Sequence, residues 1–355
     1  MFDGQTVLGN RGIMNKKRMF PQADRYCVRL LEEVRPNIYQ TTYELSSFPF
    51  APRVDMFCVV EPGERAMLID TGWWEITGVG ALNEMVRRFN VPWENVQVFL
   101  THFHNDHAGN LDFCLENGAH LVMHGPDDPL TKEDYAQFLR KTGADLVGER
   151  GDELAALAAM AGRPDLTAHG SRDVPLTGSE HIDIAGYSFK PILTPGHAPE
   201  HVCLQEEREG ILFAGDHIVE KVPLASQYKA DSQVLLRYLE GLQTVGDMNL
   251  TEMYMSHCRS RRDEEIPTEV QRIIHFYERP LRKTLNLLIE ASGEPLSIYE
   301  LACRYYAYRK ERIADLDSIT RMRRLSGVFL FAEYLHDIGL VQRVEDVDGV
   351  LRYFA

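Results

Sequence analysis

Three histidines and an aspartate within six positions are the residues of this sequence best suited to chemistry. His102, His104, Asp106 and His107 directly follow residues 96–100, a mainly apolar and β-branched run typical of a buried strand. Imidazole and carboxylate groups are ligands that zinc, iron and manganese accept. Because the chain has only 13 histidines in 355 residues, such a cluster is improbable by chance. The stretch therefore predicts a metal site in the loop that leaves this strand.

Further candidate ligands also follow apolar strands. His197 closes a Thr-Pro-Gly-His turn, Asp216 closes a Gly-Asp turn, and His257 follows the run at 251–256. Asp70 ends another apolar strand and precedes Thr-Gly, where the alternative role is the N-cap of the next helix. One such residue alone usually marks an ordinary turn. Seven candidate ligands in order, each at a strand end, indicate a single site instead.

The pattern His-x-His-x-Asp-His after an apolar strand resembles the signature of the metallo-β-lactamase superfamily of metal-dependent hydrolases. The later candidates come in the order that this family shows for a complete two-metal site. The resemblance implies one ion held by His102, His104 and His197, a second held by Asp106, His107 and His257, and Asp216 as the bridge between them. It also implies that Asp70 orients the ligands, because hydrogen bonds of this kind fix the tautomer and ring angle of an imidazole.

The expected chemistry is hydrolysis. Two divalent ions roughly 3.5–4 Å apart lower the pKa of a shared water toward ~7, so that a metal-bridging hydroxide becomes the nucleophile. Asp106 is the expected catalytic residue, because its carboxylate can orient the hydroxide and relay a proton to the leaving group. We predict two divalent ions per chain, zinc first, with iron or manganese as alternatives. His217 and Tyr228, near Asp216 in the sequence, are candidates for contact with the substrate.

The residues leave three functions open. Because no basic groove is evident, a hydrolase of small esters, thioesters or lactones is favoured. The second interpretation is a phosphodiesterase that cuts single-stranded RNA, as some relatives with a winged helix do. The third is a catalytically idle metal-binding or regulatory protein, and the complete set of ligands argues against it.

We expect an α/β (α+β) fold, the αββα sandwich of this family, with two mixed sheets face to face and helices outside. The expected divisions are an N-terminal extension at 1–35, the metallo-β-lactamase domain at 36–265 and a helical, winged-helix-like unit at 266–355. A helical insert at about 127–170 and the loop at 46–53 are expected to shape the substrate pocket. The C-terminal unit is expected to pack near the active site or at a homodimer contact rather than to read DNA.

Composition and charge disfavour several other classes. The net charge is −15, and residues 270–355 hold 13 basic and 12 acidic residues, so the acidity lies in the remainder. An acidic body disfavours broad nucleic-acid binding. Six scattered cysteines without a C-x-x-C pair indicate buried thiols in a reducing compartment. With no apolar signal segment and no long apolar run, we expect a cytoplasmic protein that has a small-molecule substrate and no membrane partner.

Overall fold

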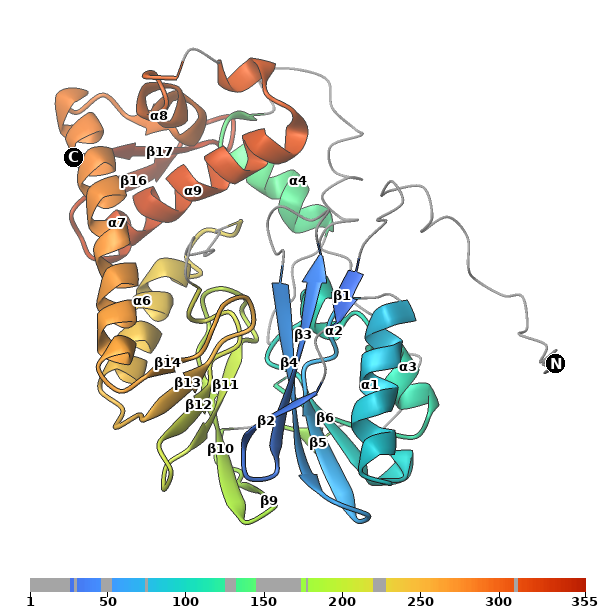
Figure 1. Ribbon diagram of the computed structural model, residues 1–355. Helices are drawn as coiled ribbons and strands as arrows, with labels where there is room; N and C mark the ends of the chain where they lie inside the picture. Colours follow the sequence, from blue (N-terminus) through green and yellow to red (C-terminus); the bar gives the residue numbers. More distant parts are fainter. Residues whose placement is uncertain are drawn as a thin grey trace, which may run out of the picture.

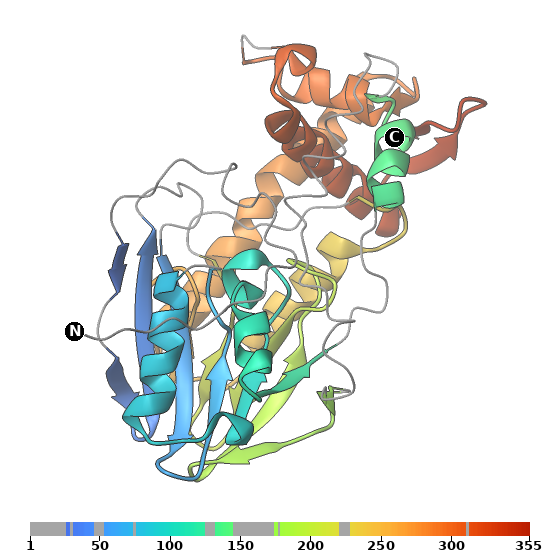
Figure 2. The same cartoon turned by 90° about the vertical axis from the view of Figure 1, so that its right-hand side faces the viewer.

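The computed structural model describes residues 26–28, 31–45, 53–73, 76–124, 132–144, 174–176, 178–219, 228–309 and 312–355. Two β-sheets pack face to face, helices cover their outer faces, and a further helical unit stands at one end of the sandwich (Figures 1 and 2). This αββα arrangement confirms the predicted fold class.

The first sheet is mixed and has the order β1-β3-β4-β5-β6-β7-β8, with β2 paired to β3. Its strands are β1 (Tyr26–Val28), β2 (Glu32–Arg35), β3 (Ile38–Leu45), β4 (Arg53–Glu61), β5 (Arg65–Ile69), β6 (Val96–Phe99), β7 (His120–Met123) and β8 (Val174–Pro175). Strands β3, β4 and β5 are antiparallel neighbours, whereas β5 to β8 run parallel. The loops after β5 and β6 therefore emerge at the same edge of the sheet.

The second sheet has the order β14-β13-β12-β11-β10-β9. Its strands are β9 (Ile182–Ile184), β10 (Tyr187–Leu193), β11 (Val202–Glu206), β12 (Ile211–Phe213), β13 (Glu252–Tyr254) and β14 (Arg261–Arg262). Strands β12 and β13 are parallel, and β10 points the same way because β11 lies antiparallel between β10 and β12. The loops that follow β10, β12 and β13 thus also share one edge.

Successive side chains of a strand point to opposite faces of its sheet, so apolar residues form a core on both faces. In β4, Phe57 and Val59 face the second sheet, where Phe57 packs on Phe213 with ring centroids 5.0 Å apart. Met56 and Cys58 point the other way, into the cluster beneath the outer helices. Those helices are α1 (Ile76–Arg88), α2 (Asn105–Ala108) and α3 (Leu111–Glu116) on the first sheet, and α6 (Val234–Gly246) and α7 (Glu265–Glu290) on the second. The single turn η2 (Trp93–Asn95) leads into β6.

Helix α7 runs continuously through Pro280 and extends beyond the second sheet into the C-terminal unit (Figure 1). That unit contains β15 (Leu296–Ser297), α8 (Ile298–Tyr305), η5 (Ile313–Asp315), α9 (Ser318–Asp337), β16 (Gln342–Glu345) and β17 (Leu351–Phe354). Ser297 and Glu300 form a reciprocal capping box at the start of α8. The three strands pair in the order β15-β17-β16. The observed order of elements fits the expectation for a winged helix, and that assignment stays a prediction.

A network of charged side chains joins the C-terminal unit to the segment before α6. Glu333 of α9 has no exposed surface, and its carboxylate accepts hydrogen bonds from Arg343 of β16 (2.8 Å) and from the Tyr353 hydroxyl (2.5 Å). Arg343 also donates to the Asp231 carboxylate at 2.6 Å, and the Asp231 N–H donates to Glu333 at 2.8 Å. Because a buried charge that loses its partner is strongly destabilising, Glu333 needs Arg343, and the same network links residue 231 to the C-terminal unit.

The structure departs from the sequence expectations in a few places. Strands β1 and β2 were not predicted, and because both pair with β3, the first sheet begins before the expected boundary at residue 36. The apolar pattern predicts the last helix over 326–337, whereas α9 begins at Ser318. Of the expected insert at 127–170, the structure describes helix α4 (Lys132–Lys141), which packs on the C-terminal unit through Phe138 and Leu139. Most of the remainder of the insert lies outside the described residues, as does the loop at 46–52. Among the described residues, no helix has both the length and the apolar character needed to cross a bilayer.

Candidate metal centre

The predicted ligands all lie at the edge of the sandwich where strands end. The loop after β6 carries His102 and His104 and leads into α2, which carries Asp106 and His107. The loops after β10, β12 and β13 carry the other three. Donor atoms within 4.8 Å of one another form three groups: His102, His104 and His197; His102, His107 and Asp216; and Asp106, His107 and His257. The fold therefore brings together all seven residues that the sequence analysis selected.

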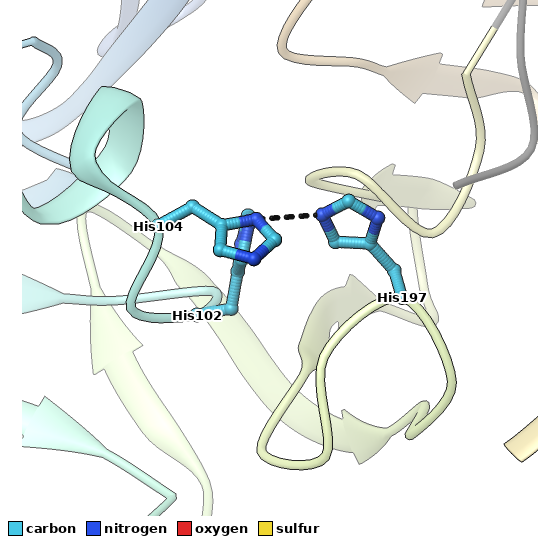
Figure 3. A group of neighbouring side chains, drawn as sticks. All are labelled: His102, His104 and His197. Atoms are coloured by element: carbon cyan, nitrogen blue, oxygen red, sulfur yellow. Dashed lines mark hydrogen bonds between the residues drawn. The ribbon is translucent and has the colours of Figure 1, made fainter. Parts of the chain in front are cut away.

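The first group consists of three imidazoles that converge on one point (Figure 3). The Nδ1 atom of His104 lies 2.9 Å from Nε2 of His102 and also 2.9 Å from Nε2 of His197. Nδ1 of His104 has either one hydrogen or one lone pair, so it can form one well-directed hydrogen bond and not two. A cation between the three nitrogens would instead accept a lone pair from each of them. The geometry of this group thus fits a metal ion.

The Asp216 carboxylate lies between the first group and the other histidines. Its Oδ1 atom is 3.4 Å from His107 Nε2, and its Oδ2 atom is 3.5 Å from His197 Nε2. The Nε2 atom of His257 is 3.1 Å from Asp216 and 3.4 Å from the carboxylate of Asp106. One carboxylate therefore reaches histidines from both halves of the cluster.

The first donor group and the part of the cluster around His107 favour opposite charge states of their histidines. Burial, reinforced by neighbouring imidazoles, lowers the pKa of His102 and of His197 well below the usual value. Burial also opposes the charged form of His107, but Asp216, Asp70 and Asp106 outweigh it and raise the pKa of His107 well above 6.5. The half that contains His107 and the carboxylates is therefore built around a positive charge, which a proton or a metal cation can supply.

Unsatisfied polar atoms point to the same conclusion. His107 Nε2 and Asp216 Oδ1 are buried and lie 3.4 Å apart, but neither makes a hydrogen bond of good geometry among the described residues. A buried polar atom left without a partner costs about 1–3 kcal/mol, so such atoms usually mark a functional position. Both atoms point into the cluster, where a divalent ion would satisfy them. The residues present therefore fit divalent metal ions.

Hydrogen bonds outside the donor groups fix the orientation of the histidines. Asp70, in a left-handed conformation with φ of 61°, accepts the Thr101 N–H at 2.8 Å and lies 2.7 Å from Nδ1 of His107. Nδ1 of His257 lies 2.6 Å from the carbonyl oxygen of Arg53, to which it donates. In both histidines, Nδ1 carries the hydrogen and Nε2 is left free to bind a metal. The contacts of Asp70 fit the orienting role expected for it.

His201 belongs to the centre, although no motif in the sequence assigns it a role. Its ring has no exposed surface, and Nε2 accepts a hydrogen bond from the backbone N–H of Asp216 at 3.1 Å. Nδ1 must then carry the hydrogen, which it donates to the Thr194 hydroxyl at 2.8 Å. The approach is so close that a Cβ atom on Gly215 would lie 2.8 Å from His201 Nε2. The partner is a backbone group far along the chain, so only the proximity of His201 to the Thr-Pro-Gly-His turn could have indicated it.

The two candidates for substrate contact both pack against aromatic rings. His217 has no exposed surface, and its ring packs against Tyr238 at 5.1 Å between centroids. A side chain so buried is inaccessible to a substrate in this conformation. The ring of Tyr228 packs edge-to-face on Phe138, 5.3 Å away, beside the apolar cluster of the C-terminal unit. A contact between Tyr228 and a substrate stays a prediction.

Comparison with known proteins identifies the family. Residues 57–247, more than half of the chain, match the family model described as the metallo-beta-lactamase superfamily. The chain belongs to this superfamily. Members of the superfamily bind divalent metals, and the His/Asp groups described above are where this metallo-beta-lactamase-fold protein offers donors for them.

Individual relatives of this superfamily member are distant. The lactamase-like protein AdaB of Aspergillus niger is 25% identical over 230 residues, which cover 65% of this chain and only 57% of AdaB. The probable metallo-hydrolase YqjP of Bacillus subtilis is 24% identical over 284 residues, 74% of this chain and 84% of YqjP. A metallo-beta-lactamase family protein from Thermus thermophilus superposes with a TM-score of 0.63 at 22% identity, over 91% of this chain and 99% of that one. The shared fold therefore extends beyond the residues that the family model matches.

Proposed function

We propose that this protein is a dinuclear metal-dependent hydrolase that acts on a small ester, thioester or lactone. One observation carries the proposal. There are three donor groups, and within each group the donor atoms lie within 4.8 Å of one another. The middle group shares His102 with the first group and His107 with the third, so the three groups are neighbours. This arrangement offers two neighbouring cation positions. The resemblance to the probable metallo-hydrolase YqjP supports hydrolysis as the reaction class.

In this proposal each ion has its own ligands. His102, His104 and His197 would hold one ion, Asp106, His107 and His257 would hold the other, and Asp216 would bridge them. The ions would lower the pKa of a water molecule and polarise the bond to be cleaved. Zinc, iron and manganese all suit nitrogen and carboxylate donors, and zinc is the first choice.

Asp106 has the position that the proposed acid–base role needs. It is partly exposed, whereas Asp70 and Asp216 are buried, so its carboxylate is the one of the three nearest to the solvent side. Its Oδ2 atom lies 3.4 Å from Nε2 of His257. From there the carboxylate can accept a proton from the attacking water and deliver it to the leaving group. His104 is exposed beside it, so a substrate can approach from this side.

The charges around the cluster support a small acyl substrate. The net charge is −15, and the acidity lies outside residues 270–355, in the part of the chain that holds the cluster. A substrate with several phosphates would be repelled by this charge, whereas an ester, thioester or lactone presents a neutral carbonyl. This difference favours the acyl substrates over RNA.

The test combines a metal count with a substrate panel. We expect two divalent ions per chain in the purified protein, and turnover of at least one class in a panel of small esters, thioesters and lactones. His104→Ala should lower the metal content and reduce turnover by about a hundredfold or more. His275→Ala, which removes an exposed histidine of α7 outside the donor groups, is the matched control and should change neither.

Two results would contradict this proposal. A protein that binds no metal, even when divalent ions are supplied, cannot work in the proposed way. Cleavage of single-stranded RNA at a higher rate than any acyl substrate, lost in His104→Ala, would show that the centre is a phosphodiesterase.

A further inference from the structure

The C-terminal half of α7 borders a cavity of about 370 Å³ that has no part in the metal centre. Its lining residues are Arg279, Arg282, Lys283, Asn286, Leu287 and Glu290. The volume lies at the lower end of the range for small-molecule sites. The spacing of three to four residues puts all six on one side of the helix. At 1.5 Å per residue, the distance along the helix from position 279 to position 290 is roughly 16 Å.

The cations of this cavity are not neutralised by acidic neighbours. Within the described ranges, Arg279, Arg282 and Lys283 form no ion pair with a carboxylate, whereas Arg272 on the same helix binds Glu269 at 2.7 Å. The chain as a whole carries a net charge of −15. Three unneutralised cations within five positions of such an acidic protein form a local positive potential, which an anionic ligand would stabilise.

Aromatic residues hold one of these cations in place. The Lys283 ammonium lies 4.2 Å from the ring centroid of Tyr305 and 4.6 Å from that of Tyr308, and it donates a hydrogen bond to the Tyr305 carbonyl oxygen. These contacts remove much of the freedom of a long side chain before any ligand arrives. Tyr308 itself is 67% exposed, so part of its surface is available to a ligand.

We propose that this cavity binds a nucleoside diphosphate. Arg279 and Arg282, one helical turn apart, offer planar groups that pair bidentately with the oxygens of adjacent phosphates. Toward the other end, Asn286 and Glu290 can hydrogen-bond the hydroxyls of a sugar, because an ionised carboxylate accepts them. Leu287 and the exposed surface of Tyr308 offer apolar contact for a flat base.

The arrangement favours a small ligand over a long nucleic acid. Glu290 ends the positive stretch at one end of the cavity, so a phosphate chain that continued along the helix would meet a negative charge. The remainder of the protein outside residues 270–355 is strongly acidic and would repel a polyanion. The cations of the cavity match two phosphates rather than a continuous backbone.

Calorimetric titration of the full-length protein with ADP at fixed ionic strength tests the proposal. We expect one ADP per chain, with adenosine at least about tenfold weaker because it lacks the phosphates. Arg279→Gln and Arg282→Gln should each weaken ADP binding by about tenfold, since each removes a charged hydrogen-bonding group. Arg237→Gln, which changes an exposed arginine of α6 outside the cavity, is the matched control and should bind ADP normally.

The outcomes separate this site from the metal centre and from a surface for RNA. His104→Ala should retain ADP affinity, so failure of the hydrolase proposal would leave this one standing. ADP binding that Arg282→Gln leaves unchanged would place the ligand elsewhere and overturn the proposal, as would the absence of binding. Tighter binding of a single-stranded RNA decamer than of ADP, lost in Arg282→Gln, would also overturn it and assign the cavity to a polyanion.

Discussion

Replacement of His201 by Phe tests whether this residue orients the metal-bridging candidate Asp216. Phenylalanine keeps nearly the volume of the ring in a position with no exposed surface, but it removes both ring nitrogens. The backbone N–H of Asp216, which donates to His201 at 3.1 Å, would lose its partner. The Thr194 hydroxyl would keep a second contact, because it lies 3.3 Å from Cys203 Sγ.

The expected loss of stability follows from this single unsatisfied group. A buried N–H without a partner costs about 1–3 kcal/mol, so we expect the free energy of unfolding of the metal-free protein to fall by that amount. The effect on metal binding should be larger than stability alone explains. Loss of a residue that orients a ligand typically weakens metal affinity by about 10–100-fold, and we expect a value in this range.

The measurements are urea unfolding of the metal-free protein and zinc titration against a competing chelator. His217→Phe is the matched control, because His217 is equally buried but its ring makes no hydrogen bond to a metal-ligand residue. We expect the control to change stability without changing zinc affinity. The reasoning is refuted if His201→Phe binds zinc as tightly as the unchanged protein, because the ring would then serve packing alone.

Two further predictions concern pH and helix capping. Although burial opposes it, Asp216 and Asp106 raise the pKa of His257 to about 9. Folding therefore favours protonated His257, and this contribution is complete below about pH 6.5 and lost as pH rises through about 9. Urea unfolding of chelator-treated protein should show that decline, and a flat profile would contradict it. Ser297→Ala removes the capping box of α8 and should destabilise the protein by about 1 kcal/mol in the same assay, with no change in metal content.

The sequence predicts those parts of the fold in which local patterns and tertiary burial agree. The mainly apolar run at 54–60 predicts a strand, and β4 is buried on both faces, so its continuous apolar character has a direct structural cause. The sequence does not predict strand β2, because its exposed residues Glu32 and Glu33 are poor strand formers. Pairing with β3 makes this segment a strand. The start of α9 was missed because Arg321 and its charged neighbours interrupt the apolar repeat. In the fold, Arg321 is buried and donates to the Leu316 carbonyl oxygen.

The candidate site divides in the same way. All seven donors could be selected from sequence, because each lies in a loop or short helix that follows a strand and because their order resembles that of the superfamily. His201 could not be assigned a role, because its function depends on the backbone of Asp216, and backbone groups have no signature in sequence. The burial of His217 also could not be predicted from the sequence, because it results from the packing of α6, where Gly241 leaves room for the ring.

The network around Glu333 bears on how the chain folds during synthesis. All seven donors lie before residue 258, so a ribosome makes them before it makes α9 and β16. Yet Asp231, in the segment between the Asp216 loop and α6, is held by Glu333 and Arg343. A nascent chain that ends before α9 would carry every donor without that anchor. Because these contacts join residues 102 and 112 positions apart, they form late in folding, and the segment before α6 gains this anchor only when the C-terminal unit docks.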